Sequence, residues 1–68
     1  MDKPIVIPIM VTTKAEAILD LIKLQEDFRI KGALLHNIDT YSFEAHQHNQ
    51  KVRVSWDGCY IVSEIIIN

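Results

Sequence analysis

The last third of the chain contains three short segments that fit together as antiparallel strands. They are residues 41–46, 51–56 and 59–64. Asp57-Gly58 joins the second segment to the third, and Asp-Gly is a strong hairpin signal because a two-residue type I′ turn needs positive φ at both positions. We therefore predict a three-stranded antiparallel meander in this part of the chain.

The predicted turn sets the register between the second and third strands. Trp56 would face Cys59, and pairing would continue outward from the turn. The farther pairs would be Val54 with Ile61, Arg53 with Val62, and Lys51 with Glu64, the last of opposite charge.

The first hairpin of the meander predicts that the sheet has one apolar and one polar face. With His48 and Asn49 at the centre of its loop, Glu44 falls opposite Arg53 as a second complementary pair. The other pairs are Gln47–Gln50, His46–Lys51, Ala45–Val52, Phe43–Val54 and Tyr41–Trp56. A slip of one residue would exchange the faces. The apolar face would hold Tyr41, Phe43, Ala45, Val52, Val54, Trp56, Cys59 and Ile61, and the polar face Ser42, Glu44, His46, Lys51, Arg53, Ser55, Tyr60 and Glu64.

A strand and a helix are expected before the meander. Residues 5–11 are apolar at nearly every position, which favours a strand, and Pro8 places that strand at an edge or at a bulge. The sequence from Thr13 to Glu16 is a capping box, so a helix should begin near Lys14. It should end near Gly32, which tolerates left-handed geometry.

The expected helix has a broad apolar side. At about 100° per residue, one side carries Ala17, Ile18, Leu21, Ile22, Leu24 and Phe28, and the opposite stripe carries Glu16, Asp20, Lys23, Asp27 and Lys31. Leu19 and Ile30 fall outside the main apolar arc, so the sheet would not shield them from solvent. This excess of apolar surface is a first indication of self-association.

The C-terminal isoleucines are a second indication. Residues 65–67 place large β-branched groups on both sides of an extended strand. One helix covers only one face of a sheet, so a second copy or another protein would cover the rest. Alternatively, the N-terminal strand or residues 33–35 fold over it. Our interface candidates are Tyr60, Val62, Ile65 and Ile67.

The predicted fold class is α+β, in the order β-α-β-β-β, with one helix packed on one face of a mostly antiparallel sheet. Residues 1–68 form a single small domain, and a chain of this length buries only about 60% of its unfolded surface. The single cysteine excludes an intrachain disulfide framework and favours the cytoplasm. A net charge of −2 gives no general attraction to phosphates or membranes, and no apolar stretch reaches the length of a membrane span.

Few residues suggest chemistry. His46 and His48, with His36 upstream, have side chains that bind metals, but two histidines beside a turn do not complete a tetrahedral site. Cys59 is expected in the core, where thiols are usually inert. We predict no catalytic residue, no cofactor and no metal, and whether His46 and His48 bind a metal stays open.

The sequence therefore predicts a non-enzymatic interaction or regulatory module. It would form a homodimer or larger homo-oligomer and bind an unidentified protein partner through its sheet face, a strand edge or its C-terminal segment. An accessory protein of a phage or mobile element is one hypothesis, suggested by the small size and the lack of motifs. The alternative is a nucleic-acid-binding module, because His46, Lys51, Arg53 and Tyr60 mix cations with a stackable aromatic ring on the polar face.

Overall fold

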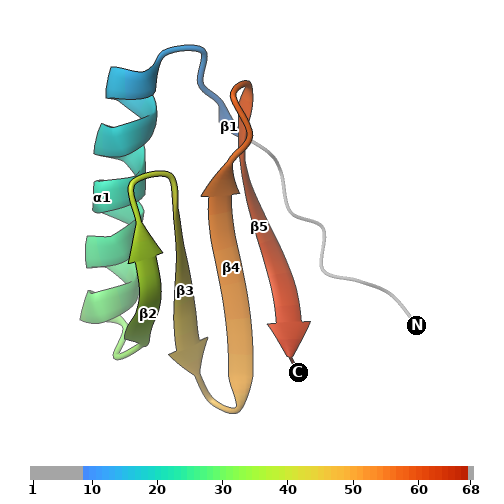
Figure 1. Cartoon of the computed structure of the whole chain (residues 1–68). Helices are drawn as coiled ribbons and strands as arrows, with labels where there is room; N and C mark the ends of the chain where they lie inside the picture. The colour runs from blue at the N-terminus through green and yellow to red at the C-terminus, as the bar shows by residue number, and fades with distance from the viewer. Residues whose placement is uncertain (1–8, 68) are drawn as a thin grey trace.

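The chain folds as a helix on one face of a five-stranded sheet, which confirms the predicted α+β class (Figure 1). The computed structural model describes residues 9–67. All neighbouring strands are antiparallel, in the order β1-β5-β4-β3-β2. The elements are β1 (Ile9–Met10), α1 (Lys14–Ile30), β2 (Leu34–Asp39), β3 (Ser42–Gln47), β4 (Gln50–Trp56) and β5 (Tyr60–Ile67).

Helix α1 begins and ends where the sequence predicts. The Thr13 hydroxyl accepts a hydrogen bond from the Glu16 amide at 3.3 Å and donates one to the Glu16 carboxylate at 3.1 Å. At the other end Gly32 has φ +92°, and its amide donates to the carbonyl of Arg29. The Ala33 amide donates to the carbonyl of Phe28, which completes a Schellman motif.

The β3–β4 hairpin has the predicted register. Phe43 lies opposite Val54, Glu44 opposite Arg53, and the predicted pairs continue to Gln47–Gln50. His48 and Asn49 both have positive φ, +51° and +61°, as a type I′ turn requires. The two faces of this hairpin therefore follow from its sequence.

The predicted register of β4 with β5 is wrong by two residues. Trp56 lies opposite Ile61, not Cys59. Arg53 lies opposite Glu64, and a further register shift between Val52 and Lys51 places Lys51 opposite Ile67. A shift of two residues keeps Tyr60, Ile61 and Glu64 on their predicted faces, so Val54 and Ile61 are still buried together.

The Asp57 carboxylate explains this shift. It accepts hydrogen bonds from the amides of Cys59 and Tyr60, each at 2.8 Å, while the Asp57 amide donates to the Tyr60 carbonyl at 3.1 Å. Gly58, with φ +107°, is therefore the first central residue of the turn. The Cys59 side chain, predicted in the core, is exposed at this turn instead.

Strand β2 was not predicted, and residues 33–35 were expected to be a connection. Leu34 pairs with His46, Leu35 with Ala45, and His36 with Glu44. The register then shifts before Asp39, where Asn37 has φ +49°. This bulge interrupts the alternation of the strand, so its sequence lacks a clear period of two.

Strand β1 lies at a sheet edge, as Pro8 indicated. Ile9 pairs with Ile61 and Met10 with Tyr60, whereas residues 5–8 of the predicted strand lie outside the described residues. Val11 follows as a buried residue whose carbonyl accepts the indole N–H of Trp56 at 2.8 Å. The core lies between α1 and the sheet, and its buried side chains are Val11, Ala17, Leu21, Ala33, Phe43, Ala45, Val54 and Ile61.

Candidate functional site: the open face and the β2 edge

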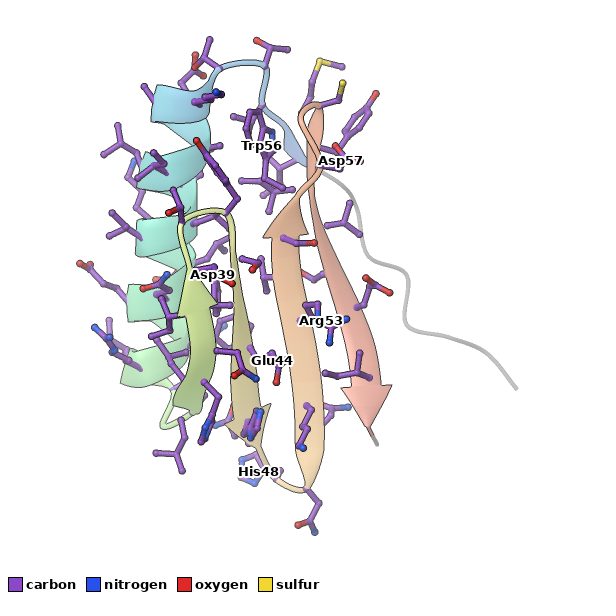
Figure 2. The ribbon with its side chains drawn as sticks, in the orientation of Figure 1. Asp39, Glu44, His48, Arg53, Trp56 and Asp57 are labelled. Carbon is purple, nitrogen blue, oxygen red and sulfur yellow. The ribbon has the colours of Figure 1, made fainter. Side chains whose placement is uncertain are left out.

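The sheet has one face covered by α1 and an opposite face, here called the open face. Pairing places one row of side chains across it, in the order His36, Glu44, Arg53 and Glu64. Figure 2 shows Glu44 on β3 and Arg53 on the neighbouring strand β4. The charges along the row alternate, because Arg53 has a carboxylate opposite it on each adjacent strand.

Glu44 is the centre of the polar contacts in this row. Its Oε1 lies 3.3 Å from His46 Nε2, and its Oε2 accepts a hydrogen bond from Arg53 Nη2 at 3.5 Å. Hydrogen bonds from His46, Asn37 and Arg53 hold the pKa of the Glu44 carboxyl below its ordinary value of 4.5. The carboxylate therefore stays charged and offsets the Arg53 cation beside it.

The three histidines divide between two places. His36 and His46 stack on the open face, with ring centroids 4.1 Å apart and an interplanar angle of 21°. His48 lies at the tip of the β3–β4 hairpin (Figure 2). Within residues 9–67, no group of three or more metal-binding side chains has a geometry that could hold a metal ion.

The four residues of the nucleic-acid hypothesis do share the open face but do not form one patch. His46 and Lys51 are directly opposite each other, and Arg53 lies one row away beside Glu44. Tyr60 lies at the far end of β5, where it pairs with Met10. The positive charge of Arg53 is already opposed by acidic neighbours.

The interface candidates on β5 divide between the two faces. Tyr60 and Val62 are on the open face, where Tyr60 is exposed and Val62 is half-buried. Ile65 pairs with Val52 on the helix-covered face and is half-buried. The backbone of Ile67 pairs with Lys51, and its side chain lies outside the described part of the structure.

A larger set of exposed apolar side chains lies along α1 and the edge strand β2, which neighbour each other at one margin of the molecule (Figure 1). Leu19, Ile22 and Ile30 fall within one arc of the helix at about 100° per residue. Leu34 and Ile38 are exposed on β2, and Leu34 lies on the open face because it pairs with His46. We call these five residues the apolar rim. The sequence had indicated Leu19 and Ile30, but Leu34 and Ile38 could be found only by recognising β2 as an edge strand.

Comparisons with protein-family models, with curated proteins and with solved structures found no match to the chain. Among the described residues, no helix has the length and apolar character needed to cross a membrane.

Proposed function

We propose that this protein is a non-enzymatic interaction module that associates with a second copy of itself through the edge of β2 and the apolar rim. The observation that carries the proposal is that the edge strand β2 exposes Leu34 and Ile38 while the neighbouring helix α1 exposes Leu19, Ile22 and Ile30. Ile30 is 83% exposed and Leu34 is 67% exposed. Covering side chains of this size is worth roughly 1.5–3 kcal/mol each when burial is complete.

The chemistry of β2 suits pairing with another strand. An edge strand presents unpaired backbone donors and acceptors, and lysine or proline on the edge usually opposes further pairing. Residues 34–39 contain neither, and Asp39 is their only acidic or basic side chain apart from His36. The bulge at Asn37 limits regular pairing to the first half of the strand. The edge is therefore short but apolar and little charged.

The β2 edge favours a second copy of this chain as its binding partner. In a two-fold dimer the same surface of both subunits meets, so two β2 edges that lie antiparallel and cross at His36 bring Leu34 near Ile38 of the other copy, through side-chain contact rather than a regular ladder where the bulge intervenes. Leu34 of each copy would then contact Ile38 of the other, once on each side of the two-fold axis. A small domain that buries only about 60% of its unfolded surface gains stability from this added burial.

Sedimentation equilibrium with two matched variants tests the proposal. Leu34 and Met10 are 67% and 66% exposed and lie on opposite edges of the sheet. We expect Leu34→Lys to weaken dimerisation at least about tenfold, roughly 1.4 kcal/mol, and Met10→Lys to leave it near the parent value. A parent chain that stays monomeric up to millimolar concentration would refute self-association.

The β5 candidates provide a competing surface for the same function. Val62→Lys places a charge among the open-face residues without touching β2. If this variant dissociates the dimer and Leu34→Lys does not, the interface lies on β5 rather than on β2. The nucleic-acid alternative is less favoured, because Arg53 lies between Glu44 and Glu64 in the sheet.

A further inference from the structure

We propose that the tip of the β3–β4 hairpin binds a phosphoryl group. A hollow of about 380 Å³ lies at this tip, open to solvent. We call it the tip basin, and it is lined by His46, Gln47, His48, Asn49, Gln50 and Lys51. The proposal does not depend on the proposed self-association, because the basin and the apolar rim share no residue.

Among the described residues, the lining is rich in hydrogen-bond donors and contains no carboxylate. It holds an ammonium group, two imidazoles and three carboxamides. Lys51, His48 and Asn49 can donate to the terminal oxygens of a phosphoryl group, and lysine binds phosphate as a compact point charge. In a chain with a net charge of −2, this tip is a local gathering of basic side chains.

Within the described residues, no acidic side chain lies directly opposite Lys51 in the sheet. The partners of Lys51 across the strands are His46 on β3 and Ile67 on β5, neither of which is acidic. Glu64, the partner that the sequence predicted for Lys51, lies opposite Arg53 instead. The nearest acidic residue on β3 is Glu44, which is engaged by Arg53 and His46.

Several contacts hold the basin in shape. His46 is fixed by its contact with Glu44 and by stacking on His36. The carboxamide of Gln47 donates a hydrogen bond to the carbonyl of Lys31, which ties the hairpin to the end of α1. Donors that are already positioned lose less entropy when an anion binds.

An NMR titration of the full chain with inorganic phosphate tests the proposal, with sodium chloride added to a reference sample at equal ionic strength. We expect saturable shifts confined to residues 46–51, with a dissociation constant on the order of millimolar. Equal shifts in chloride, or shifts of similar size at lysines throughout the chain, would overturn the proposal.

Two variants and a control locate the site. Lys51→Gln should weaken phosphate binding about tenfold or more, because a hydrogen bond to a charged group is lost. His48→Asn removes an imidazole but keeps a residue that tolerates positive φ, and it should weaken binding severalfold. Lys23→Gln removes an exposed lysine from α1 and should change nothing. Unchanged affinity in a folded Lys51→Gln protein would overturn the proposal.

A mononucleotide and a short oligothymidylate distinguish the sources of the phosphoryl group. Similar affinity per phosphate for both supports recognition of a small phosphorylated molecule. Much tighter oligothymidylate binding that falls steeply with salt supports recognition of a nucleic-acid backbone phosphate at the same basin. Failure of both ligands to shift residues 46–51 would contradict phosphoryl recognition.

Discussion

At the scale of single residues, Asp57 has the clearest structural role. Asp-Gly predicts that Asp57 occupies the turn itself, yet its carboxylate instead caps the amides of Cys59 and Tyr60. This capping moves the turn to Gly58 and Cys59 and shifts β5 by two residues against β4. The Asp-Gly dipeptide alone does not decide whether Asp57 occupies the turn or its carboxylate accepts hydrogen bonds from the amides that follow.

The stability that Asp57 contributes should depend on pH. Hydrogen bonds from the amides of Tyr60 and Cys59 lower its pKa below the ordinary value of 3.8. A carboxyl whose pKa is lower in the folded state stabilises the fold above 3.8, and this contribution is lost as pH falls through the folded pKa. The difference in Tm between the parent and Asp57→Ala should therefore be largest near pH 7 and shrink in acid. A constant difference from pH 7 to about pH 2 would contradict this role.

Gly58 should be hard to replace for a backbone reason. A Cβ there would meet no atom within 4 Å, but φ is +107°. We expect Gly58→Ala to lower the free energy of unfolding by about 1–2 kcal/mol, the cost of placing an L side chain at positive φ. Chemical denaturation measures the change, and a loss much smaller than 1 kcal/mol would show that the turn rearranges at little cost.

At the scale of elements, the sequence predicts best where independent signals agree. In the β3–β4 hairpin the turn residues, the apolar alternation and the Glu44–Arg53 pair all require one register, and that register is present. In β5 the run of large apolar residues is compatible with several even shifts, so the prediction depended on the Asp-Gly turn and on the opposite charges of Lys51 and Glu64. Strand β2 was missed because the bulge at Asn37 breaks its alternation.

The corrected register has an energetic consequence at the charged positions. Glu64 should couple to Arg53, its neighbour across the strands, and not to Lys51. In double-mutant cycles made with Glu64→Gln, we expect a coupling of a few tenths of a kcal/mol with Arg53→Gln and about zero with Lys51→Gln. A larger coupling of Glu64 with Lys51 than with Arg53 would contradict this register and support the one predicted from the sequence.

The N-terminus of α1 offers a separate test of a predicted element. Thr13 caps the helix through its hydroxyl, whereas Thr12 beside it is exposed and has no such role in the cap. Thr13→Ala should destabilise the fold by about 1 kcal/mol, and Thr12→Ala by less than about 0.5 kcal/mol. Equal losses in thermal unfolding would argue against the cap.

At the scale of the whole molecule, the candidate surfaces could be predicted only in part. The alternating polar positions correctly placed Glu44, His46 and Arg53 on one face. The stacking of His36 on His46, and the exposure of Leu34 and Ile38, both depend on β2 and so could not be seen before that strand was known. A surplus of exposed apolar surface was predictable, but the part of it that Leu34 and Ile38 contribute on β2 was not.

Self-association through β2 is tested most directly by an isotope-filtered NOE experiment on a dimer made of one labelled and one unlabelled copy. We expect contacts between copies from Leu34 and Ile38 on β2, together with Ile30 of α1. Contacts between copies that come only from Tyr60, Val62 or other β5 residues, or no such contacts at a concentration where the chain is dimeric, would contradict the proposed interface.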